Sequence, residues 1–167
     1  MDVSQEELER LAAELGRILL ARGWMLATAE SCTGGWVAQA VTAVAGSSAW
    51  FDRGFVTYGN AAKMDMLGVK PGTLDRHGAV SEATVREMAE GTLRHSWAQA
   101  ALAISGIAGP GGGTPDKPPG LVCFAWAIAG EPTTTAVLRF AGDRRSVRAQ
   151  SVRAALRGLL DRLAAMP

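Results

Sequence analysis

Short apolar runs alternate with longer amphipathic stretches along the chain, and this alternation limits the folds that the chain can adopt more than any other feature. Apolar residues repeat at helical spacing in the longer stretches, the first of which begins with the capping box Ser4-x-x-Glu7. The short runs have the length and apolar character of buried strands. The predicted helices cover residues 4–22, 36–44, 60–67, 81–93 and 143–163, and the predicted strands cover residues 24–29, 51–58, 100–104, 121–129 and 133–140.

Helices flank the strands throughout, which predicts an α/β fold with a three-layer α/β/α sandwich. The last two strands follow one another through the hairpin connection Gly130-Glu131-Pro132. A hairpin joins antiparallel strands, so the sheet is expected to be mixed and not purely parallel. We find no internal repeat and no linker, and therefore expect one domain over residues 1–167.

Composition excludes several classes of partner. The formal net charge is +1, so no general basic field favours nucleic acid. The first residues form an acidic amphipathic stretch and not a signal peptide, and the apolar runs are too short to cross a membrane. Two cysteines and two histidines show no zinc-binding spacing. We therefore expect a cytoplasmic protein with no metal site and no nucleic-acid or membrane partner.

A serine stands where the first predicted strand runs into a helix opened by glycines, within Thr28-Ala29-Glu30-Ser31-Cys32-Thr33-Gly34-Gly35. Such a junction exposes Ser31 and leaves free N–H groups around Cys32, Thr33, Gly34 and Gly35, which could hold an oxyanion. The spacing alone favours a helix cap, with glycines that only permit a tight turn.

A serine nucleophile needs a base, and neither His77 nor His95 has a suitable setting. Lys63 follows Tyr58-Gly59-Asn60 directly after a strand, at the edge of the sheet where Ser31 is expected if the two strands are neighbours. A lysine accepts a proton near neutral pH when burial lowers its pKa. The alternative is an ordinary solvated lysine.

The glycine-rich segment 106–120 is a long loop inside a compact domain, and such loops are often functional. Its spacing is neither that of a Walker loop nor that of a dinucleotide fingerprint, so we expect no ATP or NAD cofactor. Its free N–H groups could instead bind an anion such as a phosphate group. The predicted anion-binding residues are Gly109, Gly111, Gly112, Gly113, Thr114 and the nearby Lys117.

Two arginines, Arg144 and Arg145, open the last predicted helix. The helix dipole disfavours cations there unless an anion is present, so Arg145 is a candidate to contact a phosphate, and a solvated basic residue is the alternative. The remaining arginines of this helix are expected to form a solvated basic face; they are Arg148, Arg153, Arg157 and Arg162.

Six blocks of sequence, in order and over nearly the whole chain, resemble the CinA C-terminal domain family. They are residues 28–35, Tyr58-Gly59-Asn60-Ala61-Ala62-Lys63, Gly78-Ala79-Val80-Ser81, residues 105–112, Lys117-Pro118-Pro119-Gly120 and Phe140-Ala141-Gly142-Asp143-Arg144. Two positions depart from the family pattern: Gly59 stands where a serine is common, and Ala45 where a proline is common.

The resemblance implies a cofactor-independent amidase that converts nicotinamide mononucleotide into nicotinic acid mononucleotide and ammonia. It implies that Ser31 is the nucleophile and Lys63 its base, with Tyr58 and Ser105 as polar neighbours. It also favours a homodimer or a higher homo-oligomer. Cys32 is a rival nucleophile, although its side chain is expected to point away from Ser31 into the interface between helix and sheet.

Two other functions stay open from the sequence. Related domains occur fused to a further domain and carry a name tied to competence, so a non-catalytic nucleotide-binding or regulatory module is one alternative. An amidase acting on another small amide is the second.

Overall fold

Five strands form one mixed sheet in the order β2-β1-β3-β4-β5 in the computed structural model, which describes residues 2–167. Strand β1 pairs in parallel with β2 and β3, and β4 is antiparallel to both β3 and β5. The strands are β1 (Leu26–Glu30), β2 (Phe51–Val56), β3 (Ala100–Gly106), β4 (Leu121–Ile128) and β5 (Thr134–Arg139). The described helices are α1 (Gln5–Arg22), α2 (Trp36–Thr42), the 3-10 turn η1 (Ser47–Ala49), α3 (Asn60–Leu67), α4 (Pro71–His77), α5 (Glu82–Arg94) and α6 (Arg144–Ala164).

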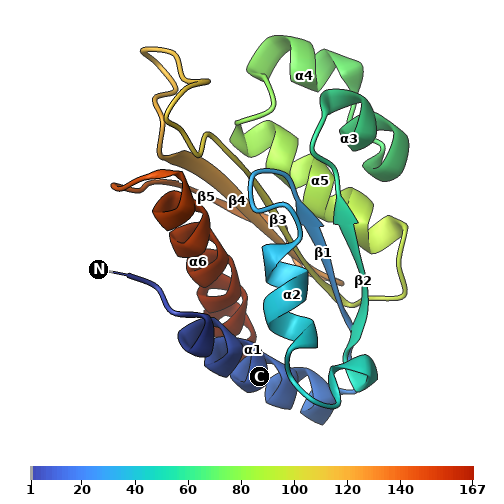
Figure 1. The fold of residues 1–167 in the computed structure, drawn as a ribbon. Coiled ribbons are helices and arrows are strands. Elements are labelled where there is room, and N and C mark those ends of the chain that lie inside the picture. The colour runs from blue at the N-terminus through green and yellow to red at the C-terminus, as the bar shows by residue number, and fades with distance from the viewer. Residues whose placement is uncertain (1) are drawn as a thin grey trace.

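The helices form two layers, one on each face of the sheet (Figure 1). Helices α1, α2 and α6 pack on one another and on one face, while α3 and α4 pack on α5, which lies across the other face. The predicted three-layer α/β/α sandwich with a mixed sheet is therefore confirmed.

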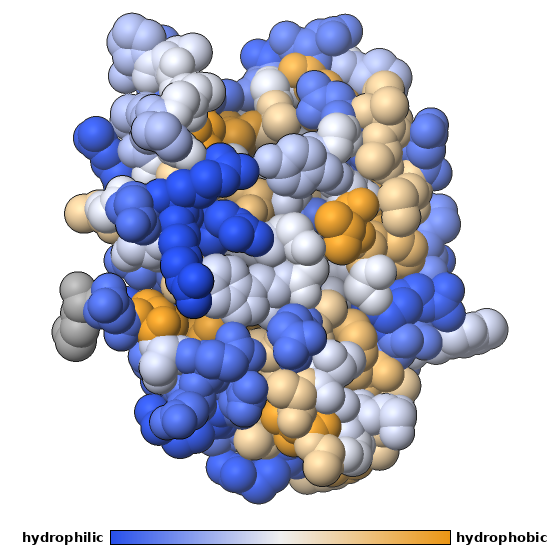
Figure 2. Space-filling model, in the orientation of Figure 1, coloured by the Kyte–Doolittle hydropathy of each residue, from blue (hydrophilic) through white to orange (hydrophobic). Residues whose placement is uncertain are grey.

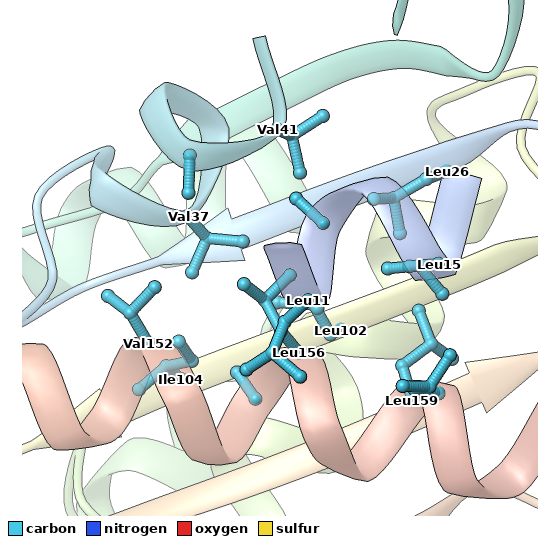
Figure 3. Packing of buried hydrophobic residues seen from close by; sticks show 14 of the residues in the cluster. Leu11, Leu15, Leu26, Val37, Val41, Leu102, Ile104, Val152, Leu156 and Leu159 are labelled. Carbon is cyan, nitrogen blue, oxygen red and sulfur yellow. The ribbon is translucent and has the colours of Figure 1, made fainter. Parts of the chain in front are cut away.

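The two faces of the sheet carry side chains of very different size. Because side chains alternate along a strand, Leu102 and Ile104 face α1, α2 and α6, whereas Ala101 and Ala103 face α5. Large aliphatic side chains from α1, α2 and α6 fill the first core (Figure 3). The second face is lined mainly by alanine, so α5 can approach the sheet closely, and this face is the one that carries the site described below.

All five predicted helices and all five predicted strands are present, with ends shifted by one or a few residues. The structure adds α4 and η1, for which no element was predicted from the sequence. Proline is well suited to the first turn of a helix because its missing N–H would have no partner there, and α4 begins at Pro71. Within residues 2–167, no helix combines the length and the apolar character needed to cross a membrane.

The close packing of α5 gives a stability prediction. A Cβ atom added at Gly91 would lie 2.0 Å from the backbone oxygen of Leu67 in α3, so Gly91→Ala must push the two helices apart. We expect a loss of about 1–3 kcal/mol in the free energy of unfolding, measured in urea.

Gly72→Ala is the matched control, because the Cβ atom added at this helical glycine meets nothing within 4 Å. Alanine has the higher helix propensity, so this variant should be unchanged or gain up to about 1 kcal/mol. Equal stability of the two variants would contradict the tight contact between α3 and α5.

Candidate active site

Three parallel strands end in polar residues at the same edge of the sheet. Ser31 follows β1, Thr57 and Tyr58 follow β2, and Ser105 lies near the end of β3. The connection from β1 to β2 runs over one face through α2, and that from β2 to β3 runs over the other face through α3, α4 and α5. Ligands of α/β proteins bind where consecutive connections diverge in this way.

Strand alternation separates two neighbouring residues, Glu30 and Ser31. The Glu30 carboxylate points toward α2, where it accepts hydrogen bonds from the N–H groups of Val37 (2.8 Å) and Ala38 (3.1 Å). Ser31 points to the opposite side, toward α3. The buried carboxylate thus satisfies the start of α2, whose N-cap Gly35 has no side chain to do so.

Lys63 lies in the first turns of α3, and its side chain is only 1% exposed. Its Nζ atom lies 3.2 Å from Ser31 Oγ, 2.9 Å from the carbonyl oxygen of Thr57 and 3.0 Å from that of Tyr58. The structure therefore brings the expected nucleophile and the expected base to hydrogen-bond distance.

Burial lowers the pKa of Lys63 below its ordinary value of 10.5, because the low-dielectric surroundings disfavour the ammonium form. Among residues 2–167 no carboxylate forms an ion pair with this amine. An uncharged amine can donate its two N–H groups to the two carbonyl oxygens and turn its lone pair toward the Ser31 hydroxyl. This arrangement suits a general base.

The turn between β1 and α2 offers backbone donors beside Ser31. Within residues 2–167, no carbonyl accepts a hydrogen bond from the N–H of Cys32 or Thr33, whereas that of Gly34 is taken by the Ser31 carbonyl at 3.0 Å. Of the four predicted oxyanion residues, Cys32 is the one that lines the cavity described next. Its N–H is the best placed of the four.

The Cys32 side chain is buried in the core formed by α1, α2 and α6, as expected. Burial raises the pKa of its thiol to about 11, against the opposing positive charge of Arg148. A thiol with this pKa is protonated at neutral pH, and only the thiolate is a strong nucleophile. The geometry thus favours Ser31 over Cys32 as the attacking group.

A cavity of about 260 Å³ opens in front of the Ser31–Lys63 pair. It is lined by Ser31, Cys32, Tyr58, Lys63, Ala79, Val80, Ser105, Gly106, Ile107, Ala108, Gly109, Gly111, Gly112 and Arg144. The predicted catalytic residues and three of the predicted loop glycines therefore share one cavity. Within residues 2–167, no group of three or more His, Cys, Asp or Glu side chains is arranged to hold a metal ion.

Four predicted phosphate-binding residues lie elsewhere. The cavity lining given above does not include Gly113, Thr114 or Lys117. Lys117 Nζ donates a hydrogen bond to the carbonyl of His77, and this bond ties the loop to the end of α4. Arg145 lines a separate hollow together with Asp143. Successive residues of a helix point about 100° apart, so neighbouring arginines at the start of α6 reach different sites.

Arg144 is the arginine that reaches the cavity, and the sequence did not single it out over Arg145. Its guanidinium donates hydrogen bonds to the carbonyl of Gly109 (3.0 Å) and to the hydroxyl of Tyr58 (3.2 Å). It therefore bridges the glycine-rich loop and the end of β2. Strongly hydrophilic side chains gather over the N-terminal part of α6 on the face shown in Figure 2.

Comparison with known proteins agrees with this geometry. The sequence model of the CinA C-terminal domain matches residues 8–163. The chain belongs to the CinA C-terminal domain family. It is 53% identical over 157 residues to the nicotinamide-nucleotide amidohydrolase PncC of Escherichia coli K12, covering 94% of this chain and 95% of that protein. It is 52% identical over 149 residues to PncC of Enterobacter agglomerans, covering 89% and 91%.

A solved structure of this family has the same fold. The competence damage-inducible protein A of Klebsiella pneumoniae superposes with a TM-score of 0.92 at 48% identity, and the match covers 96% of this chain and 99% of the other.

The two departures from the family pattern lie at different distances from the site. Gly59 is the N-cap of α3, one turn before Lys63, and provides no side-chain cap for the helix. A Cβ atom added there meets nothing within 4 Å, so the position has room for the serine common in the family. Ala45 is exposed and lies between α2 and η1, away from the lining of the cavity.

The lowered pKa of Lys63 predicts a pH dependence of stability. Between this lowered pKa and 10.5, the unfolded chain binds a proton on Lys63 that the folded chain does not, so the contribution of this group to the free energy of unfolding rises with pH. Lys63→Met removes that contribution.

The measurement is urea unfolding of the wild type and of Lys63→Met over the pH range in which both fold. We expect the stability of the wild type relative to the variant to increase as pH rises. A difference that stays constant or decreases would show that Lys63 is charged in the folded protein.

Proposed function

We propose that this chain hydrolyses the amide of nicotinamide mononucleotide to nicotinic acid mononucleotide and ammonia. The observation that carries the proposal is the buried amine of Lys63 at 3.2 Å from Ser31 Oγ, in a cavity at the carboxyl edge of the sheet. Two relatives more than 50% identical to this chain carry the name nicotinamide-nucleotide amidohydrolase. Their matches extend over nine-tenths of the chain, including both residues of the pair.

In the proposed reaction, uncharged Lys63 removes the hydroxyl proton of Ser31 while Ser31 Oγ attacks the amide carbon. The N–H of Cys32 stabilises the oxyanion of the tetrahedral intermediate, an interaction worth about 3–4 kcal/mol in other enzymes. Lys63 then gives its proton to the leaving nitrogen, so that ammonia departs and an ester forms on Ser31. Water, deprotonated by Lys63, hydrolyses the ester and releases the acid.

The remaining side chains of the cavity are proposed to hold the substrate. Ser105 contributes a buried hydroxyl and Tyr58 an aromatic ring at the mouth, 61% exposed. Gly109, Gly111 and Gly112 bring backbone groups to the same space. Arg144 is the guanidinium nearest to a phosphate that would extend from the nicotinamide toward solvent, and it takes the role that the sequence suggested for Arg145.

The other two functions predict different results in one assay. A non-catalytic nucleotide-binding module, suggested by the competence-related name of the Klebsiella relative, would release no ammonia from any amide. An amidase for another substrate would release ammonia from that amide and not from the nucleotide. The Ser31–Lys63 contact favours the enzyme over the binding module.

Removal of the hydroxyl tests the proposed nucleophile. We expect Ser31→Ala to lower kcat for ammonia release from nicotinamide mononucleotide by about 10³-fold or more, with binding of the nucleotide retained. Binding is measured by calorimetry and turnover by an ammonia assay.

Cys32→Ala is the matched control, since it changes the neighbouring side chain without removing the hydroxyl of Ser31. It should keep kcat within about threefold of the wild type, since its backbone N–H is unchanged. Turnover that survives in Ser31→Ala but disappears in Cys32→Ala would make the cysteine the nucleophile.

Arg144 is tested by comparing substrates with and without the phosphate. A hydrogen bond to a charged group contributes about 1.5–3 kcal/mol, so Arg144→Ala should raise KM for the nucleotide about tenfold or more. KM for the unphosphorylated riboside should change much less. Arg145→Ala, in the adjacent position, should leave both KM values near those of the wild type. If Arg145→Ala raises KM for the nucleotide and Arg144→Ala does not, Arg145 and not Arg144 binds the phosphate.

A further inference from the structure

A second arginine of α6, Arg148, contacts the turn that carries Ser31. Its Nε donates a hydrogen bond to the carbonyl of Cys32 (2.9 Å), and one terminal nitrogen donates to the carbonyl of Thr33 (3.2 Å). The guanidinium also lies over the ring of Trp36, 5.5 Å from its centroid. A residue expected on a solvated face thus binds two consecutive peptide groups beside the nucleophile.

Arg148 has no carboxylate partner among residues 2–167, unlike Arg153 one and a half turns further along α6, which pairs with Glu7 at 3.5 Å. Its positive charge is therefore left to act on the turn itself. The Cys32 thiol responds to this charge: burial raises its pKa, and Arg148 is the strongest influence in the opposite direction. The guanidinium thus places positive charge beside the turn, opposite the Glu30 carboxylate, and positive charge there favours a developing oxyanion.

The hydrogen bonds of Arg148 also fix the orientation of the peptide groups. In a trans peptide unit the C=O and the N–H point in opposite directions, so holding the carbonyl of Cys32 determines where the N–H of Thr33 points. The preceding unit is held from within the turn: the Ser31 carbonyl accepts a hydrogen bond from the Gly34 N–H, and within residues 2–167 no carbonyl accepts one from the N–H of Cys32. A hydrogen-bonded carbonyl also makes the N–H of its own peptide unit a stronger donor.

The turn is held from its other side by Glu30, which accepts hydrogen bonds from two N–H groups at the start of α2. A carboxylate therefore takes the donors that follow the turn, and Arg148 binds two acceptors within it, of which the Thr33 carbonyl also accepts a hydrogen bond from the Trp36 N–H (3.0 Å). Within residues 2–167, no carbonyl accepts a hydrogen bond from the N–H groups of Cys32, Thr33 and Gly35.

We propose that Arg148 is a positioning residue of the amidase: by binding the carbonyl groups of Cys32 and Thr33, it holds the turn after Ser31 so that Gly34 keeps its hydrogen bond to the Ser31 carbonyl and the N–H of Cys32 is directed at the oxyanion. The inference rests on the proposed function, because it assigns Arg148 to the same reaction. Arg148 itself touches neither substrate nor reacting atoms.

The test compares Arg148→Ala and Arg148→Lys with Arg153→Ala, which removes an arginine of the same helix away from the turn. A misplaced oxyanion donor weakens binding of the transition state and not binding of the substrate. Arg148→Ala should therefore lower kcat about 10–100-fold and change KM less than about threefold. Added guanidinium ion should restore part of kcat in Arg148→Ala and have no such effect on Arg153→Ala. Arg148→Lys should fall between, since its ammonium cannot bind both carbonyls with the same geometry.

Two results would overturn the inference: kcat of Arg148→Ala equal to that of Arg153→Ala, or a rise in KM without a loss of kcat. Folding of Arg148→Ala is judged by its unfolding transition. If this variant does not fold, kcat and KM of Arg148→Lys are compared with those of Arg153→Ala, and the same two results would overturn the inference.

A second measurement separates this inference from the choice of substrate. A fluorophosphonate forms a bond between its phosphorus and Ser31 Oγ and releases fluoride, and it requires the same nucleophile and oxyanion donors as an amide. If the wild type is labelled but does not hydrolyse the nucleotide, the proposed substrate is wrong, and slower labelling of Arg148→Ala than of Arg153→Ala still supports the role of Arg148. Equal labelling rates of these two variants, or no labelling of the wild type, would overturn it.

Discussion

The chemistry proposed for this domain depends on the burial of one amine. Lys63 is enclosed with two carbonyl oxygens and a serine hydroxyl as its partners, and no carboxylate pairs with it among residues 2–167. A charged lysine would be costly in such a place, so the protein favours the uncharged form. That form can accept a proton from Ser31. Without this burial, the serine would be an ordinary hydroxyl beside a solvated cation.

The sheet makes this burial possible through the alternation of its side chains. Ser31 and Ser105 point to the face that α5 covers, and the strands carry alanine on that face. Small side chains bring α5 close to the sheet, and α3, which carries Lys63, packs on α5. Glu30 and Cys32, the neighbours of Ser31, point to the opposite face and stabilise the turn from there. Adjacent residues at the end of β1 thus point to opposite faces of the sheet: Ser31 toward Lys63, and Glu30 toward the helix that follows the turn.

Much of the fold could be predicted from sequence, because hydrophobic periodicity is a local signal. Strand ends alone left Ser31 open to being a helix cap and Lys63 to being a solvated lysine, and the resemblance to the CinA family singled out the pair. Ser31 and Lys63 follow two strands that turn out to be neighbours, and parallel neighbours end at the same edge. The roles of the arginines in α6 could not be predicted in this way. Whether Arg144, Arg145 or Arg148 faces the cavity depends on the rotation of the helix against the sheet, and a basic run has no periodicity that reveals it. The contact of Lys117 with the end of α4 was likewise not predicted from the sequence.

The central claim, that burial lowers the pKa of Lys63 beside Ser31, can be measured directly. The chain has three lysines, so a nuclear magnetic resonance titration of 13C-labelled lysine side chains gives three signals, and that of Lys63 is assigned by its absence in Lys63→Met. The account predicts that Lys63 loses its proton at a pH well below the ordinary 10.5. Titration of this signal at or above 10.5 would contradict it, because a permanently charged Lys63 cannot take the proton of Ser31.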